Sequence, residues 1–324
     1  MNHSQRSPYN VLIIGGGQIG ALYDTPDSPS FRSHAHCFTE HPRFAKPGIV
    51  EPNAEQRRKV ADRWNCTTFE TLDAALTQTV DAAVVAVPDF LHYSVLKELA
   101  QHQLKLVIAE KPMTKTVKES EEILSLYRSR NIPLCVNYTR RFAPGFAALK
   151  ERIQLGEFGQ LLQGTGWYGK GVVHNGSHLV DLLLFLFGNA SAESVFHRVN
   201  DFYEDDPAVS ALLRIGSNNA PFVLQGIDCR CFTIFEIELF FQKGRLRMTN
   251  HGETVEEYGI EPGKEFAGYQ FLHKKTETPT GLNKAMYNVA EAAAQFLDNG
   301  VPLPSTGETA FAAQKLCCHL QSRL

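Results

Sequence analysis

The first half of the chain alternates short apolar runs with longer stretches in which apolar residues recur at helical spacing. The apolar runs cover residues 11–14, 48–50, 81–87, 104–109 and 133–136. Such runs are typical of strands that are buried on both faces of a parallel sheet. Helical spacing covers residues 34–41, 55–64, 73–76, 93–101 and 117–130. The alternation predicts βαβ units, and therefore an α/β domain with a doubly wound parallel sheet that ends near residue 137.

The pattern changes in the second half of the chain. Helices are expected at residues 146–155 and 177–187, and strands at 160–168, 193–200, 208–215, 221–231, 234–241 and 244–249. Gly, Asn and Pro turns separate most of these strands, and long crossovers are rare, so the sheet should be mainly antiparallel. Two helices, at 284–299 and 306–322, close the chain. We therefore expect a second, α+β domain over residues 138–324.

Composition narrows the choice of partners. The 324 residues are 43% hydrophobic and 21% charged, and the formal net charge of −3 provides no broad basic field. We therefore expect a small-molecule ligand, and neither nucleic acid nor a membrane, as the main partner. The first ten residues lack the apolar core of a signal peptide, and the seven cysteines form no C-x-x-C pair. These features favour reduced thiols and a cytoplasmic protein.

A glycine-rich stretch follows the first apolar run directly. Gly15, Gly17 and Gly20 fit the pattern G-x-G-x-x-G, with Gln18 and Ile19 inside it. In this pattern the first glycine makes a tight turn, the second lets the backbone approach a pyrophosphate, and the third lets a helix pack on a strand. We therefore expect a dinucleotide here, with its diphosphate on backbone N–H groups.

Two features after this turn bear on the ligand. Residues 21–33 carry two prolines and several Asp and Ser residues, and are either an inserted loop at the ligand-binding edge of the sheet or a solvated surface loop. Glu51 ends the second apolar run, where a carboxylate can accept hydrogen bonds from ribose hydroxyls and would repel a 2′-phosphate. This favours NAD over NADP, although Arg57 and Arg58 could hold a phosphate instead.

The strand expected at residues 104–109 ends in Glu110, Lys111 and Pro112. These residues should lie at the carboxyl edge of the sheet, beside the expected nicotinamide. A lysine there can donate to a substrate hydroxyl and stabilise a developing alkoxide. The alternative interpretation is an ion pair at the end of a strand.

Several further motifs occur in a fixed order with these: Pro88 and His92 after the third apolar run, the segment Asn137-Tyr138-Thr139-Arg140-Arg141-Phe142, and Gly176-Ser177-His178-Leu179-Val180-Asp181. The set resembles the glucose–fructose oxidoreductase/inositol dehydrogenase/rhizopine catabolism (Gfo/Idh/MocA) family over nearly the whole chain. The resemblance implies an N-terminal Rossmann domain over 1–137 that binds NAD(P). It also implies a C-terminal domain that binds substrate and whose open sheet supports a homodimer or homotetramer.

The resemblance also implies roles for single residues. Lys111 matches the family's substrate-orienting lysine, and His178 matches the histidine with the acid/base role. The expected cofactor contacts are Gly15, Gly17, Gln18, Ile19, Gly20, Glu51, Pro88, His92, Glu110 and Lys111. The expected substrate contacts are Lys111, Asn137, Arg140, Arg141, Tyr168, His174 and His178.

One position departs from the family pattern. An aspartate commonly stands four residues before the catalytic histidine, and here that position is His174. Either His174 itself contacts substrate or serves as the base, or oxidation is impaired and the protein only binds its ligands. The pairs His174/His178 and His34/His36 have spacings compatible with metal binding, but no carboxylate or cysteine stands at third-ligand spacing, so we expect no metal.

The leading hypothesis is an NAD(P)-dependent dehydrogenase that acts on CH–OH groups. It would transfer a hydride between nicotinamide and a carbinol carbon of a sugar, cyclitol or nucleotide-sugar. Lys111 would polarise the reacting oxygen, while His178 or His174 moves the proton. Two alternatives remain: a catalytically silent NAD-binding sensor on the same fold, and a lyase or hydrolase that oxidises its substrate transiently with bound NAD.

Overall fold

The computed structural model describes residues 7–265 and 267–323, which form two compact units. The first unit contains the described residues up to Phe142 together with Asn283–Phe311, and the second contains Ala143–Leu282 and the rest of the C-terminal segment. Residues 283–311 join the first unit because helix α8 (Ala285–Asn299) packs on α1 (His34–Glu40). The predicted division at residue 137 did not include this return of the chain.

A sheet of six parallel strands forms the centre of the first unit, in the order β3-β2-β1-β4-β5-β6. The strands are β1 (Val11–Ile14), β2 (Gly48–Val50), β3 (Thr68–Phe69), β4 (Ala82–Val85), β5 (Leu106–Ala109) and β6 (Leu134–Val136). Each of the strands β1, β4 and β5 has four residues, and all of them are buried, as the apolar runs predict. The expected doubly wound parallel sheet is confirmed. Within this sheet only β3 was not predicted, because a strand of two residues has no recognisable hydrophobic pattern.

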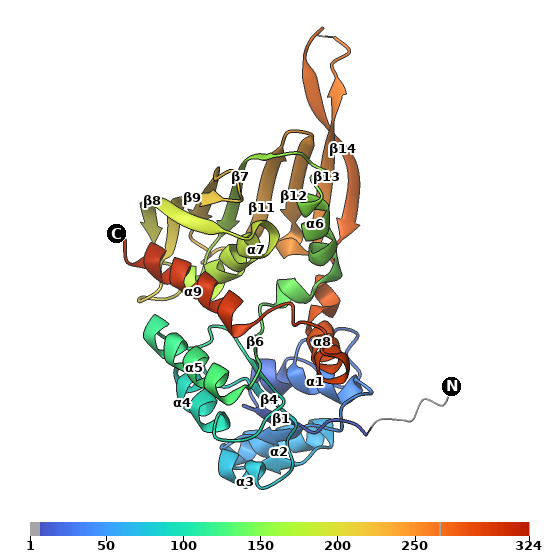
Figure 1. Ribbon diagram of the computed structural model, residues 1–324, viewed down its shortest axis with the longest axis vertical. Helices are drawn as coiled ribbons and strands as arrows, with labels where there is room; N and C mark the ends of the chain where they lie inside the picture. Colours follow the sequence, from blue (N-terminus) through green and yellow to red (C-terminus); the bar gives the residue numbers. More distant parts are fainter. Residues whose placement is uncertain (1–6, 266, 324) are drawn as a thin grey trace, which may run out of the picture. The chain divides into compact units, whose positions relative to one another are not determined.

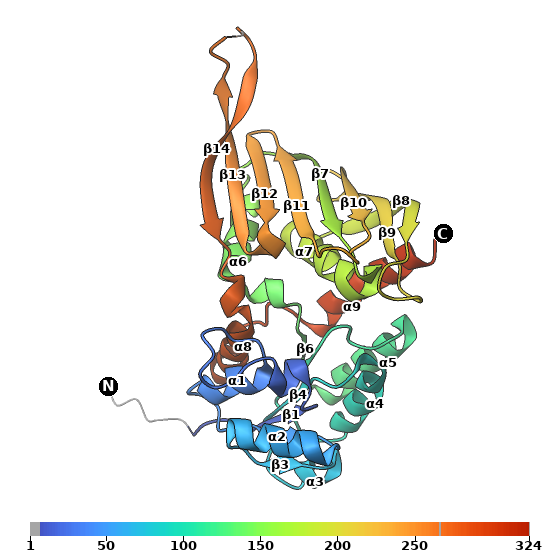
Figure 2. The same cartoon turned by 180° about the vertical axis from the view of Figure 1, so that it is seen from behind.

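Helices cover both faces of this sheet. Besides α1 and α8 they are α2 (Ala54–Trp64), α3 (Leu72–Leu76), α4 (Asp89–Leu99) and α5 (Val117–Arg130). Figure 1 and Figure 2 show α4 and α5 together on one side of β1 and β4, with α1 and α2 on the other. A capping box fixes the start of α5, because Thr116 and Glu119 each accept a hydrogen bond from the other's backbone N–H.

The inserted segment after β1 is held at both ends. The chain makes a five-residue helical turn, Gln18–Leu22, and then an irregular loop that ends at Ser33, the N-cap of α1. The buried carboxylate of Asp24 accepts hydrogen bonds from the backbone N–H of Arg32 at 2.6 Å, from the Ser33 hydroxyl and from His36 Nδ1 at 2.9 Å. This network anchors the loop, while most residues between Asp24 and Arg32 are exposed.

A mixed sheet of eight strands forms the second unit, in the order β14-β13-β12-β11-β7-β10-β9-β8. The strands are β7 (Leu161–Tyr168), β8 (Ala190–Val199), β9 (Ala208–Ile215), β10 (Ala220–Gly226), β11 (Phe235–Phe241), β12 (Gly244–Thr249), β13 (Thr254–Pro262) and β14 (Gln270–Pro279). Only the β7–β10 pair is parallel, which confirms the prediction of a mainly antiparallel sheet. The expected strand over 221–231 ends earlier, at Gly226.

Helices α6 (Pro144–Gln154) and α7 (Ser177–Phe187) cover one face of this sheet, as the opposite views in Figure 1 and Figure 2 show. On that side two glycines of β7 make room for the fully buried ring of Phe222. A Cβ atom at Gly164 would lie 2.7 Å from Phe222 Cδ2, and one at Gly166 would lie 3.0 Å from Cζ. The ring thus fills the space of two missing side chains.

The hairpin of β13 and β14 was not predicted. All ten residues of β14 are exposed, so the strand has no buried face to produce an alternating pattern. Its charged residues pair across the hairpin: Lys274 Nζ lies 2.8 Å from Glu256 Oε1, and Lys275 pairs with Glu261. The far end of the hairpin extends beyond the neighbouring strands of the sheet (Figure 1).

All seven cysteines are free thiols, and four of them are buried: Cys37, Cys135, Cys229 and Cys317. Within residues 7–265 and 267–323, no helix is both long enough and apolar enough to cross a membrane.

The packing of Phe222 leads to a stability prediction. Phe222→Ala should lower the free energy of unfolding by about 3 to 5 kcal/mol, because the adjacent glycines cannot fill the cavity. Phe232→Ala is the matched control, since Phe232 is 59% exposed and its loss should change stability by less than about 0.5 kcal/mol. Urea unfolding followed by circular dichroism measures both. Equal midpoints for the two variants would contradict this account.

Candidate functional site

The glycine turn lies where β1 ends, and its glycines differ in the space around them. Gly15 has a φ of +109°, and a Cβ atom there would lie 2.5 Å from the carbonyl oxygen of Ala86. A Cβ atom at Gly20 would lie 1.9 Å from the carbonyl oxygen of Gly15. At Gly17, by contrast, no atom lies within 4 Å of the Cβ position. The first and third glycines therefore close the turn, and the second leaves open space beside its backbone for a ligand.

Glu51 follows β2 and lies against this turn. The side chain is 7% exposed, and Oε2 accepts hydrogen bonds from the backbone N–H of Gly16 at 3.1 Å and from Gln56 Nε2 at 2.7 Å. Oε1 accepts from the backbone N–H of Asn53 at 2.9 Å. The carboxylate is thus fixed beside the glycine turn, as its position at the end of the second predicted strand implied.

Arg57, the alternative phosphate ligand, is already engaged by the protein. Its guanidinium donates to the carbonyl oxygens of Glu51 and Pro52, at 2.8 and 2.9 Å, and to Glu70 Oε2 at 3.2 Å. These contacts hold the positive charge against the backbone at the end of β2. A 2′-phosphate at this position would have to compete with them.

His92 connects two of the segments that follow strands at the carboxyl edge of the sheet. The ring is buried in the first turns of α4, just after Pro88, which is the N-cap of that helix. Its Nδ1 lies 2.7 Å from the carbonyl oxygen of Pro112, and its Nε2 lies 2.9 Å from that of Val87. The segment after β4 is thereby tied to the segment that carries Lys111.

Glu110 and Asn137 come together at the ends of β5 and β6. Asn137 Nδ2 donates to Glu110 Oε1 at 2.7 Å, and the same oxygen lies 2.8 Å from His34 Nε2. His34 is fully buried at the start of α1, so this contact links the inserted segment to the strand that precedes Lys111. Lys111 itself is partly exposed at the same edge of the sheet.

These contacts control the charge of Glu110. Burial by itself would raise the pKa of the carboxyl group. Hydrogen bonds from His34 and Asn137, together with the charges of His34 and Lys111, outweigh burial and lower the pKa of Glu110 below its ordinary value of 4.5. The residue therefore stays ionised beside Lys111 at neutral pH.

The remaining predicted residues of the first unit follow β6. Arg140 and Arg141 lie in the turn Thr139–Phe142, where Arg140 is partly exposed and Arg141 is buried. Arg141 Nη1 donates to the carbonyl oxygen of Pro304 at 3.3 Å. Arg141 thus helps to attach residues of the C-terminal return to this unit, in addition to any contact with a ligand.

Three predicted residues belong to the second unit. Tyr168 at the end of β7 is fully buried, and its hydroxyl both donates to the carbonyl oxygen of Val209 and accepts from its N–H, each at 2.9 Å. Tyr168 therefore has a packing role, and it has no part in the function proposed below. His174 lies in the helical segment Gly171–Gly176, and His178 lies in the first turn of α7.

A carboxylate that no sequence pattern indicated lies against His174. Asp206 Oδ2 is 2.7 Å from His174 Nδ1, and the Tyr203 ring stacks on the imidazole with centroids 4.0 Å apart. Asp206 follows Glu204 and Asp205 in a polar segment, DFYEDD, which reads as a solvated turn. Nothing in that segment indicated a partner 32 residues earlier in the chain.

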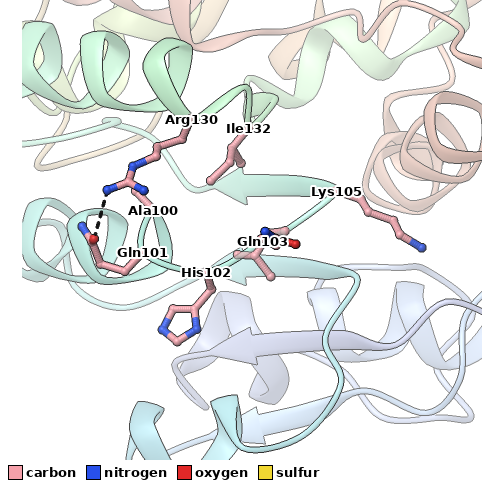
Figure 3. Close-up of a pocket in the computed structure, with 8 residues that line it drawn as sticks. Ala100, Gln101, His102, Gln103, Lys105, Arg130 and Ile132 are labelled. Carbon is pink, nitrogen blue, oxygen red and sulfur yellow. Dashed lines mark hydrogen bonds between the residues drawn. The ribbon is translucent and has the colours of Figure 1, made fainter.

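Neither of two other kinds of site, a metal centre and a surface groove, includes the predicted site residues in the described parts of the chain. No cluster of three His, Cys, Asp or Glu side chains among the described residues is arranged to hold a metal ion. A groove of about 530 Å³ lies at the amino ends of β5 and β6, away from Lys111, and is lined by Gln101, His102, Lys105 and Arg130 among others (Figure 3). None of the predicted site residues lines it.

The lowered pKa of Glu110 predicts a specific loss of stability in acid. An ionised Glu110 stabilises the fold above its unfolded pKa, and this contribution is lost as the pH falls through its folded pKa. The free energy of unfolding should therefore decrease more steeply below about pH 4.5 in the wild type than in Glu110→Gln. Exposed Glu98 provides the control, and Glu98→Gln should keep the wild-type slope in urea unfolding series. Parallel slopes for Glu110→Gln and the wild type would contradict the assignment.

Known proteins match parts of this chain in sequence. Residues 9–138 match the model of the oxidoreductase family with an NAD-binding Rossmann fold. An inositol 2-dehydrogenase of Corynebacterium glutamicum is 31% identical over 160 residues, which are 48% of this chain and 44% of that protein. A UDP-N-acetylglucosamine 3-dehydrogenase of Acidithiobacillus ferrooxidans is 27% identical over 43% of this chain and 40% of its own length. The matched part of the chain thus spans less than half the length of each of these two curated relatives.

Solved structures extend the likeness to the whole fold. The structure of the Acidithiobacillus ferrooxidans enzyme matches 97% of this chain and 97% of its own, with a TM-score of 0.77 and 18% identity. An oxidoreductase of Agrobacterium radiobacter in complex with NAD+, L-tartaric acid and magnesium matches 96% and 94% of the two chains, with a TM-score of 0.74 and 14% identity. Both units therefore have the fold that the sequence resemblance implied, and residues 9–138 match the family model of oxidoreductases with an NAD-binding Rossmann fold, the Gfo/Idh/MocA family.

Proposed function

We propose that this protein is an NAD-dependent dehydrogenase that acts on a CH–OH group of a sugar, cyclitol or nucleotide-sugar. The observation that carries the proposal is the glycine turn, which leaves open space at Gly17 and meets the fixed carboxylate of Glu51. Lys111 lies at the same carboxyl edge of the parallel sheet, where ligands bind in open α/β folds. The names of the relatives, which act on inositol and on a UDP-sugar, support the substrate class.

The preference for NAD over NADP rests on charge. Glu51 would accept hydrogen bonds from the hydroxyls of the adenosine ribose, and its negative charge would repel a 2′-phosphate. Arg57, which could otherwise neutralise that phosphate, donates to two carbonyl oxygens and to Glu70. The groups around the end of β2 therefore suit a free 2′-hydroxyl.

Lys111 and a histidine have separate roles in the proposed reaction. When bound, NAD+ supplies the chemistry of hydride acceptance. The ammonium group of Lys111 would donate to the reacting oxygen and stabilise negative charge that develops there, while His174 or His178 takes the hydroxyl proton. Positioned proton transfer of this kind typically contributes about 10² to 10⁴-fold to the rate.

The glycine turn provides the first test of the proposal. Gly17→Ala should weaken NADH binding at least about tenfold, because its methyl group would enter the space intended for the pyrophosphate. The same change should leave the free energy of unfolding within about 0.5 kcal/mol, since no protein atom opposes it. Gly20→Ala should instead destabilise the fold itself, because its Cβ atom would lie 1.9 Å from the Gly15 carbonyl oxygen.

Fluorescence titration with NADH and NADPH, together with urea unfolding, separates these effects. We expect the wild type to bind NADH more tightly than NADPH. A Gly17→Ala protein that binds NADH as tightly as the wild type would contradict the cofactor site.

Lys111 provides the second test. Lys111→Ala should lower turnover by at least about 10²-fold while NADH affinity stays within a few fold, because the lysine acts on the substrate oxygen. Exposed Lys115 is the matched control, and Lys115→Ala should keep wild-type turnover. Turnover is followed by NADH absorbance with a panel of sugars, cyclitols and nucleotide-sugars.

The same assay distinguishes the proposal from its alternatives. Tight NADH binding without a change in absorbance for any member of the panel would favour a sensor. Protein that is purified with bound NAD and converts substrate without net NADH would favour transient oxidation in a lyase or hydrolase. Full activity in Lys111→Ala would remove the lysine from the mechanism.

A further inference from the structure

We propose that Asp206 is a positioning residue, which holds His174 in the orientation and tautomer needed to take the substrate proton. The inference rests on the proposed function and names the proton-transfer group of that reaction. It also answers the question raised by His174, which stands where the family commonly has an aspartate. In this chain the carboxylate comes from the segment before β9 instead.

The contact between the two side chains is short, and Asp206 is buried whereas His174 is partly exposed. Asp206 Oδ2 lies 2.7 Å from His174 Nδ1, and the carboxylate is 4% exposed whereas the imidazole is 34% exposed. A carboxylate that accepts from Nδ1–H leaves Nε2 as the nitrogen that exchanges protons. The pair thus has a buried orienting member and an accessible reacting member.

The carboxylate is itself held in place by its surroundings. Oδ2 accepts from the backbone N–H of His174 at 2.8 Å, and Oδ1 accepts from the backbone N–H of Val173 at 3.0 Å and from Gln321 Nε2 at 3.3 Å. A Cβ atom at Gly171 would lie 2.0 Å from Oδ2, so only glycine leaves room for the carboxylate there. These contacts restrain Asp206 more strongly than an exposed ion pair would.

Tyr203 restricts the imidazole from its flat side. The two rings are nearly parallel, with an interplanar angle of 10° and centroids 4.0 Å apart. Stacking fixes the plane of the ring, and the Asp206 contact fixes its rotation within that plane. Together they aim Nε2 in one direction, which is the requirement for a positioned acid or base.

The chemistry assigned to the pair balances with the proposed oxidation. The carbinol carbon loses a hydride to NAD+, the hydroxyl loses its proton to His174 Nε2, and the substrate becomes a ketone. The imidazole becomes an imidazolium, whose charge the Asp206 carboxylate stabilises without being protonated itself. In the reduction direction the same proton returns to the substrate oxygen.

A purely structural role is the competing explanation, because Asp206 also binds two backbone N–H groups. Asp206→Asn separates the two roles. Asparagine can keep its oxygen on the backbone N–H of Val173 while its amide group takes the place of Oδ2 and donates to His174 Nδ1, which favours the Nε2–H tautomer. A structural role alone predicts no change of tautomer.

The closing experiment reads the tautomer directly. Protein labelled with 15N-histidine is examined by NMR over a pH series, in which the tautomer is read from the signals of the neutral imidazole, and the signals of His174 are assigned by their loss in His174→Gln. We expect the Nδ1–H tautomer in the wild type and in Asp205→Asn, whose altered side chain is the exposed neighbour of Asp206. We expect the Nε2–H tautomer in Asp206→Asn.

Kinetics with the substrate found above completes the test. Asp206→Asn should lower kcat by about 10² to 10⁴-fold, with KM and NADH affinity within a few fold. The role of Asp206 would be overturned by the Nδ1–H tautomer of His174 in Asp206→Asn, or by the Nε2–H tautomer in the wild type. The second result is obtained on the wild-type protein and does not depend on the folding of a variant. Lack of turnover in the wild type would instead overturn the proposed dehydrogenase, so the two failures are distinguishable.

Discussion

The first unit depends on one close approach of backbone to backbone, where the turn after β1 meets the end of β4. Gly15 allows this approach because a Cβ atom there would overlap the Ala86 carbonyl oxygen, and Gly20 allows the turn to close on the Gly15 carbonyl oxygen. The same turn brings the N–H of Gly16 to Glu51, and so connects β1 with the end of β2. One steric constraint therefore determines both the packing of the helical turn and the shape of the proposed cofactor site.

A series of hydrogen bonds connects the segments around Lys111. His34 and Asn137 meet at one oxygen of Glu110, and His92 joins the carbonyl oxygens of Val87 and Pro112. The contacts of Glu110 with His34 and Asn137, and that of His92 with Pro112, link segments that follow different strands. The carboxyl edge of the sheet is thus a connected polar network rather than a set of separate loop ends. The residues on either side of Lys111, Glu110 and Pro112, are both held by these hydrogen bonds.

The parts that the sequence predicted well are those that depend on local pattern. Continuous apolar runs identified β1, β4 and β5, and the helical spacing of apolar residues identified α5. β14 was missed because no face of it is buried, and Asp206 was missed because its acidic neighbours resemble a solvated turn. The contacts of His34 with Glu110 and of His174 with Asp206 join residues that are distant in sequence, and no spacing along one chain can indicate such pairs.

The charged outer strand of the second unit has a consequence for the behaviour of the protein in concentrated solution. β14 is an edge strand, and an unprotected edge can pair with the edge of another molecule and begin aggregation. Here Lys274 and Lys275 lie in the middle of that edge and are paired with glutamates of the same hairpin. Adding a foreign strand would require the desolvation of these charges, so the ion pairs of the hairpin act as a barrier against irregular self-association.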